Sequence, residues 1–176
     1  MGIMQAGETL VLGMGNPILS DDAVGIRLAR ECQVRAGERP HVHYVVDCSV
    51  GGLELLDVIQ GYDRLIVFDA IKGGGGPPGT WYRMTGESFR ETLNLTNIHD
   101  ANFTTALELG RLLGAHIPRP ENIHIFAVEI IDNITFSEQM TPLLESRYPR
   151  IADEILAQAL ALLDEPICIS PEASHL

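Results

Sequence analysis

Three residues whose side chains suit acid–base or metal chemistry stand close to the ends of predicted strands or the starts of predicted helices. Asp22 lies in the first turn of the helix expected after the first strand, Asp69 lies near the end of the most apolar strand, and His99 precedes a later helix. Two carboxylates and an imidazole with open coordination positions suit a divalent transition metal that takes its remaining ligands from elsewhere. Taken singly, each has a more ordinary interpretation, as a backbone cap, a helix-dipole partner or a surface residue.

The segment 13–25, GMGNPILSDDAVG, connects the first strand to the first helix. A G-x-G at such a turn suggests a dinucleotide fingerprint, but Ile18 takes the place of the third glycine. Asp21 and Asp22 stand where a pyrophosphate would need a positive field and free N–H groups. Stabilisation of the helix dipole accounts for one of these two acids more readily than for both. We therefore expect no nucleotide cofactor.

Composition excludes several classes of protein. The chain has 176 residues with 12 Lys and Arg against 24 Asp and Glu, a net charge of −12. This balance repels phosphate backbones and anionic lipid, so we expect neither a nucleic-acid partner nor a membrane-surface protein. There is no apolar run of membrane-spanning length and no basic region of a signal peptide at the start of the sequence. A cytoplasmic location is expected.

Other potential metal ligands lack partners in the sequence. The cysteines Cys32, Cys48 and Cys168 are odd in number and show no C-x-x-C spacing, so we interpret them as free thiols. His41 and His43 share one face of a predicted strand, but no third ligand accompanies them. We interpret both histidines as exposed surface residues.

Apolar runs of strand length alternate with helical patterns, which predicts right-handed βαβ units in a mostly parallel sheet with helices on both faces. The predicted strands are 9–14, 41–47, 64–70, 79–84 (near an edge) and 122–128, and the predicted helices are 21–36, 52–60, 100–113 and 141–163. In the last helix Thr141 is the expected N-cap, and Pro149 is expected to separate a first turn or two from the main helix. We expect a single domain over 1–176, with a core at about 9–163 and a loosely ordered acidic tail at 164–176.

Ligands of open α/β sheets bind outside the carboxyl ends of the strands. Asp22, Asp69 and His99 come from separate segments, yet this topology can bring all three to that edge. The sequence therefore predicts one shared site for them.

The segment 10–25, LVLGMGNPILSDDAVG, is similar to the N-terminal signature of the [NiFe]-hydrogenase maturation endopeptidases. The resemblance runs from about residue 9 to 163 and continues through 52–56 (GLELL), 65–70 (LIVFDA), 78–80 (PGT) and His99. It implies a three-layer α/β/α fold on a twisted sheet of about five strands. Relatives often carry Gly-Gly-Thr after the second-strand acid, where this chain has Asp47-Cys48-Ser49-Val50-Gly51. We therefore count Asp47, with Gly15 and Asn16, among the residues of candidate substrate loops.

The resemblance places the family's metal-contacting positions on Asp22, Asp69 and His99. It implies removal of the C-terminal extension from the precursor of a hydrogenase large subunit after nickel has been inserted. Nickel would be carried by the substrate, whose cysteine thiolates would complete the ligand set, and the free enzyme would bind it weakly or not at all. We hypothesise that Asp22 and Asp69 orient or deprotonate a water molecule while His99 holds the metal.

Two alternatives stay open at this stage. A metal-free aspartic-type peptidase would use Asp22 and Asp69 as carboxylates that share a proton. The adjacent pair Asp21 and Asp22 cannot form that dyad, because neighbouring side chains on a helix diverge by about 100°. The second alternative is a chaperone that docks the hydrogenase large subunit and cuts nothing.

Overall fold

The structure is a computed structural model that describes residues 7–51, 53–91 and 98–167, with the backbone alone described for 89–91 and 98–102. Its strands are β1 (Thr9–Met14), β2 (Val42–Cys48), β3 (Arg64–Ile71), β4 (Trp81–Thr85) and β5 (Ile123–Glu129). Its helices are η1 (Ser20–Ala23), α1 (Val24–Ala36), α2 (Leu53–Ile59), α3 (Gly86–Glu91), α4 (Ile98–Leu112), η2 (Pro120–Asn122) and α5 (Pro142–Asp164), of which η1 and η2 are 3₁₀ helices.

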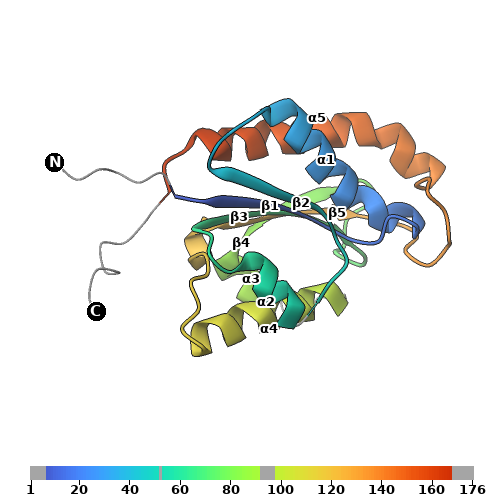
Figure 1. Ribbon diagram of the computed structural model, residues 1–176. Helices are drawn as coiled ribbons and strands as arrows, with labels where there is room; N and C mark the ends of the chain where they lie inside the picture. The colour runs from blue at the N-terminus through green and yellow to red at the C-terminus, as the bar shows by residue number, and fades with distance from the viewer. Residues whose placement is uncertain (1–6, 52, 92–97, 168–176) are drawn as a thin grey trace.

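The strands form one five-stranded sheet in the order β2-β1-β3-β5-β4. Only β4 runs antiparallel to its neighbour, and it lies at the edge, as the sequence predicted. Helices α1 and α5 cover one face and α2 and α4 cover the other, so the three-layer α/β/α arrangement is confirmed (Figure 1). The short helix α3 was not predicted.

The strand order reverses direction at β1. The next strand, β2, lies on one side of β1, whereas the following strand, β3, lies on its other side. The chain therefore leaves the carboxyl end of β1 toward the β2 edge and the carboxyl end of β3 in the opposite direction, toward the β4 edge. Such a topological switch point is the usual place for a ligand in an open α/β sheet.

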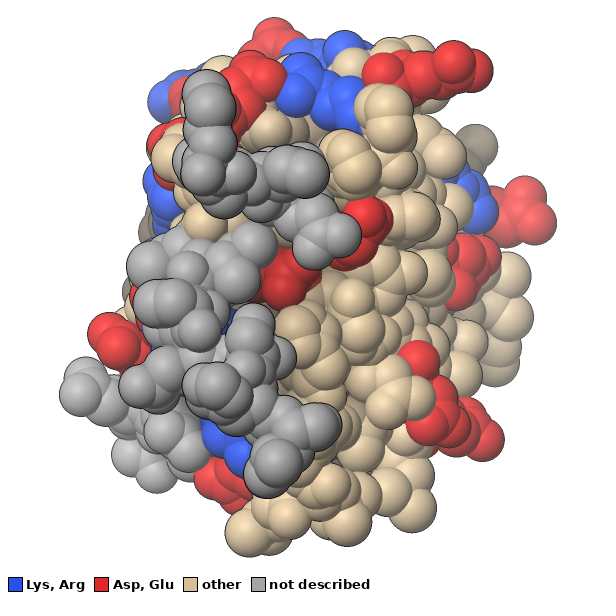
Figure 2. Space-filling view, turned by 60° about the vertical axis from the view of Figure 1, so that its left-hand side comes forward, with Lys and Arg blue, Asp and Glu red and all other residues tan. Residues whose placement is uncertain are grey.

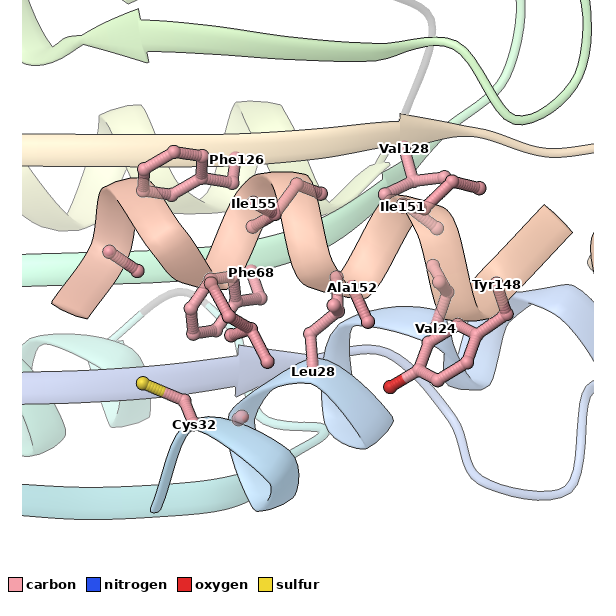
Figure 3. Packing of buried hydrophobic residues seen from close by; sticks show 14 of the residues in the cluster. Val24, Leu28, Cys32, Phe68, Phe126, Val128, Tyr148, Ile151, Ala152 and Ile155 are labelled. Carbon is pink, nitrogen blue, oxygen red and sulfur yellow. The ribbon is translucent and has the colours of Figure 1, made fainter. Parts of the chain in front are cut away.

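The core between α1, α5 and the sheet is apolar and closely packed. Phe68 of β3 and Phe126 of β5 have ring centroids 5.7 Å apart, and Ile151 and Ile155 of α5 pack on the same cluster (Figure 3). Cys32 of α1 is buried here, and this burial raises the pKa of its thiol to about 12. Among the described cysteines, Cys32 and Cys48 are both free, as predicted.

Pro149 does not interrupt the last helix, so the predicted break there is wrong. Helix α5 runs unbroken from Pro142 to Asp164 with Pro149 inside it. Pro149 is exposed, while its neighbours Tyr148 and Ile151 are buried against the sheet. Packing of the apolar face therefore holds the helix together although proline lacks the N–H of a helical hydrogen bond.

The end of α5 is held by a buried arginine. The guanidinium of Arg64, at the start of β3, donates hydrogen bonds to the carbonyls of Leu162, Glu165 (2.9 Å) and Pro166 (3.0 Å). Burial lowers the pKa of Arg64. The first residues of the expected acidic tail are thus fixed to the sheet, and residues 168–176 lie outside the described residues.

The surface agrees with the acidic composition. On the face shown in Figure 2, acidic groups are spread over the part that the structure describes, with broad uncharged areas between them and basic groups most prominent at its upper end. That part offers no broad basic surface of the kind that a polyanion would need. Among the helices that the structure describes, none is both long and apolar enough to cross a bilayer.

Helix α1 starts in direct contact with the carboxyl ends of β1 and β3. A Cβ atom on Gly25 would stand 2.4 Å from the carbonyl oxygen of Met14 and 2.5 Å from that of Phe68. Both neighbours are backbone atoms, which cannot rotate away as a side chain can. The absence of a side chain at Gly25 therefore allows the segment around Asp22 to lie over the switch point.

The buried carboxylate of Asp21 joins this segment to the chain between β5 and α5. Its Oδ1 accepts a hydrogen bond from the backbone N–H of Thr141 at 2.7 Å, and its Oδ2 accepts from the Thr141 hydroxyl and the N–H groups of Ile131 and Asp132, each at 3.1 Å. The N–H of Asp21 itself donates to the carbonyl of Asp132 at 3.0 Å. Thr141 is the N-cap of α5, as predicted, but its hydroxyl binds Asp21 rather than the helix.

Substitution Gly25→Ala is expected to lower the free energy of unfolding by about 1–3 kcal/mol, the usual effect of overpacking. The gain in helix propensity, about 1 kcal/mol, is smaller than this strain. Urea denaturation measures the change, with Gln33→Ala on the exposed side of the same helix as the control. Unchanged stability in Gly25→Ala would contradict the close approach.

Substitution Asp21→Ala is expected to cost about 3 kcal/mol or more, because it leaves three backbone N–H groups without their acceptor. A role limited to the helix dipole would cost only about 0.3–1 kcal/mol, so the size of the loss separates the two explanations. Thermal or urea unfolding gives the value. Glu138→Ala, an exposed acid in the same connection, serves as the matched control.

Candidate active site

Asp69 lies on β3 at the switch point, where its carboxylate faces the α2/α4 layer. Leu65 and Val67, four and two residues earlier on the strand, belong to the core on that face, and side chains alternate along a strand. Asp69 is 5% exposed, and its Oδ1 accepts a hydrogen bond from the N–H of Ala70 at 2.7 Å. The carboxylate therefore sits at the end of a fully buried strand.

Asp22 belongs to the segment that leaves the carboxyl end of β1. It lies in η1, directly before α1, and is 6% exposed. Helix η1 lies against β3, so both acids belong to elements in contact at the carboxyl edge of the sheet. Because Asp21 uses both carboxylate oxygens to hold the 131–141 segment, Asp22 is the member of the acidic pair that the structure leaves as the candidate for chemistry.

The loop before Asp22 is shaped by Gly15 and Asn16. Gly15 has φ +135°, and a Cβ atom there would stand 2.0 Å from the carbonyl oxygen of Asp22, so glycine is required on two grounds. The side-chain oxygen of Asn16 accepts a hydrogen bond from the N–H of Ile18 at 3.1 Å. These two residues hold the loop in its conformation, and their contact with a substrate stays a prediction.

Asp47 is directed away from the two acids by an irregularity in β2. The register between β1 and β2 shifts between Leu12 and Met14, which changes the face on which the last residues of β2 lie. The carboxylate of Asp47 lies 3.5 Å from the guanidinium of Arg30 on α1, while Cys48 belongs to the core on the α2/α4 side. The structure thus brings Cys48, not Asp47, to the side of the sheet that Asp69 faces.

Cys48 was missed as a neighbour of the site. Burial raises the pKa of its thiol, and the charges of Asp69 and Asp47 add to this effect. The thiol is therefore kept neutral beside the candidate carboxylate. The departure from the family pattern at 47–51 was the signal in the sequence that could have drawn attention to it.

Glu129, a further acid at this edge of the sheet, was also missed. It ends β5 and is buried, and its carboxylate accepts hydrogen bonds from the N–H groups of Gly73 at 2.7 Å and Gly74 at 2.9 Å. An acid at the end of an apolar strand is the same signal that singled out Asp69. Its contacts show that Glu129 anchors the glycine-rich loop that follows β3.

His99 is the second residue of α4, and its side chain lies outside what the structure describes. Helix α4 packs with α2 on the face toward which Asp69 points. Contact between the imidazole and the two carboxylates stays a prediction. Among the residues whose side chains the structure describes, no three His, Cys, Asp or Glu residues are placed to hold a metal ion together, and His99 is not one of those residues.

Asp22 and Asp69 together offer acceptor oxygens in a setting largely removed from water. Two carboxylates whose oxygens meet can bind a divalent cation, or can share one proton, because close carboxylates of low exposure cannot both ionise without cost. Either state suits the activation of a water molecule. That the oxygens of Asp22 and Asp69 meet stays a prediction. The first turn of η1 carries Asp21 and Asp22, so this turn lacks the positive field that a phosphate needs at the start of a helix.

Comparisons with known proteins agree with one another. The sequence model of a family described as hydrogenase maturation protease matches residues 26–158, which is more than half of the chain. The chain is 28% identical over 149 residues to the hydrogenase 2 maturation protease of Escherichia coli, covering 84% of this chain and 88% of that protein. It is 29% identical over 156 residues to the hydrogenase expression/formation protein HupD of Thiocapsa roseopersicina, covering 86% and 68%.

Comparison with solved structures agrees with the sequence comparison. The structure of the hydrogenase maturating endopeptidase HybD from E. coli superposes with a TM-score of 0.71 at 26% identity, covering 86% of this chain and 91% of that one. The predictions of an α/β fold and of a peptidase are thereby confirmed. The chain belongs to the hydrogenase maturation protease family.

Proposed function

We propose that this protein removes the C-terminal extension from the precursor of a [NiFe]-hydrogenase large subunit after nickel has been inserted. The observation that supports the proposal most directly is the pair of buried carboxylates, Asp22 and Asp69, at the switch point of a chain of this family. A hydrogenase is named as the target in the name of its E. coli relative. The precursor is therefore the proposed partner.

Nickel enters this proposal as cargo of the substrate. Asp22, Asp69 and His99 supply two oxygens of carboxylates and one imidazole nitrogen, a set that leaves positions open on a transition metal. Cysteine thiolates of the precursor would occupy those positions. An enzyme with such an incomplete set recognises a precursor that carries its metal and binds the metal-free form poorly.

The same contacts would place the scissile bond beside the acids. Fixing two reactants in a productive geometry is worth up to about 7–11 kcal/mol in favourable cases. One carboxylate, of Asp22 or Asp69, takes a proton from a water molecule while the oxygen of that water adds to the peptide carbonyl carbon. That proton then passes to the leaving nitrogen as the C–N bond breaks, so no other reactant is needed.

The low exposure of both acids also favours a second candidate mechanism. In an aspartic-type peptidase Asp22 and Asp69 would share a proton and activate water without any metal. His99 would then have no part in the reaction. A chaperone that docks the precursor without cleaving it is less well supported, because the chain belongs to a family of proteases.

Incubation of the purified protein with a large-subunit precursor, with and without inserted nickel, tests the proposal. We expect cleavage only of the nickel-loaded precursor, seen as loss of the extension by mass spectrometry. Equal cleavage of both forms would replace the proposal with the aspartic-type mechanism. Stable binding of the precursor without cleavage would replace it with the chaperone.

Substitution Asp69→Asn is expected to lower the rate of processing by at least about 10²-fold, because the amide cannot accept the proton of water. Asp22→Asn is expected to have a comparable effect. Asp153→Asn is the matched control, since Asp153 is an exposed carboxylate of α5 that pairs with Arg35 instead. Processing by Asp69→Asn at the rate of Asp153→Asn would remove Asp69 from the assignment.

Substitution His99→Ala is expected to abolish processing while thermal unfolding stays cooperative. If His99 holds nickel, binding of the nickel-loaded precursor should weaken while binding of the metal-free precursor stays the same. Calorimetry with the two forms of the precursor measures the difference. An unchanged processing rate in His99→Ala would withdraw the residue from the site and favour the two-carboxylate mechanism.

A further inference from the structure

Several large apolar side chains are exposed on two segments near Asp22. One is the loop that precedes it, and the other runs from the end of β5 to the start of α5. Phe136 is 81% exposed and Ile134 is 74% exposed, although both belong to an ordered turn between β5 and α5. The exposed apolar residues of this region, which we call the apolar rim, are Ile18, Ile131, Ile134, Phe136 and Leu143.

The two segments are joined by backbone hydrogen bonds. The N–H of Ser20 donates to the carbonyl of Ser137 at 2.8 Å, and the N–H of Ser137 donates to the carbonyl of Ile18 at 3.0 Å. The Asp21 carboxylate holds both ends of the connection between β5 and α5, at Ile131 and at Thr141. The apolar rim and the segment that carries Asp22 therefore form one continuous structure.

The turn that presents Ile134 and Phe136 is held by a side chain. The Oδ1 of Asp132 accepts hydrogen bonds from the N–H groups of Ile134 and Thr135, each at 2.9 Å. Hydrogen bonds from the side chain and backbone of Thr135 and the backbone of Ile134 lower the pKa of Asp132 to about 2. Preorganised exposure of apolar side chains gains nothing for folding, and it is typical of a binding surface.

We propose that the apolar rim binds an apolar segment of the precursor polypeptide next to the bond that Asp22 and Asp69 hydrolyse; this inference rests on the proposed function. A peptidase must hold a polypeptide on both sides of its catalytic groups, and the rim is continuous with the segment that bears Asp22. Asp132 and Glu138 border the rim and favour basic over acidic residues beside the apolar ones.

Charge argues against other occupants of the rim. With a net charge of −12, a second copy of this chain would repel the first, and an anionic membrane would repel both. The apolar rim therefore fits a polypeptide segment that is apolar and not acidic. Its role is to add binding energy that precursor and transition state share, rather than to take part in bond cleavage.

The test compares Phe136→Ser and Ile134→Ser with the control Val34→Ser, whose side chain is 81% exposed near the far end of α1. We expect each rim variant to raise the KM for nickel-loaded precursor about tenfold, the effect of losing about 1.4 kcal/mol of binding, with kcat unchanged within twofold. The control is expected to match the unsubstituted protein in both constants. Thermal unfolding is expected to be the same for all three variants.

Direct binding separates failure of this inference from failure of the proposed function. If the unsubstituted protein cleaves the precursor and both rim variants keep its KM, the rim proposal is wrong and the proposed function stands. If no protein cleaves but the rim variants bind the precursor more weakly in calorimetry, the rim is supported and the proposed cleavage is wrong. Dimerisation of the unsubstituted protein that Phe136→Ser abolishes, with KM unchanged, would assign the rim to self-association.

Discussion

The carboxylate of Asp21 connects parts of the chain that lie more than a hundred residues apart. It accepts hydrogen bonds from Ile131, Asp132 and Thr141, and through them it links the first helix, the end of β5 and the start of α5. A buried carboxylate is tolerated because four donors compensate for the loss of water. This group joins the segment of Asp22 to the connection that carries most of the apolar rim.

Around Asp21 the carboxyl edge of the sheet is rich in acids that do different work. Glu129 holds the glycine-rich loop and Asp47 pairs with Arg30. Asp22 and Asp69 are buried at the carboxyl edge of the sheet near β1 and β3, where the strand order reverses. The same edge of the sheet thus carries acids of structural function and the two acids to which we assign chemistry, and burial raises the pKa of the neighbouring Cys48 thiol.

Apolar periodicity in the sequence predicted where the main strands and helices lie, but local rules did not predict breaks or irregularities within them. The strands at 9–14 and 64–71 each contain a continuous apolar run, and such runs are typical of buried parallel strands. Pro149 shows the limit of local rules, because the buried face of α5 outweighs the one lost hydrogen bond. Asp47 shows another, because a register shift between strands distant in sequence decides which face its carboxylate reaches.

The sequence by itself determined the layered α/β fold, and it supplied Asp22, Asp69 and His99 as the candidates for a site at the carboxyl edge of the sheet. These follow from residue types and short-range spacing, which the chain carries locally. Tertiary structure alone decided that Asp21 is a structural group, that Cys48 replaces Asp47 on the side of Asp69, and that the apolar rim adjoins Asp22. Each of these depends on hydrogen bonds or strand register between segments far apart in the chain. A local sequence pattern does not specify which distant segments will meet.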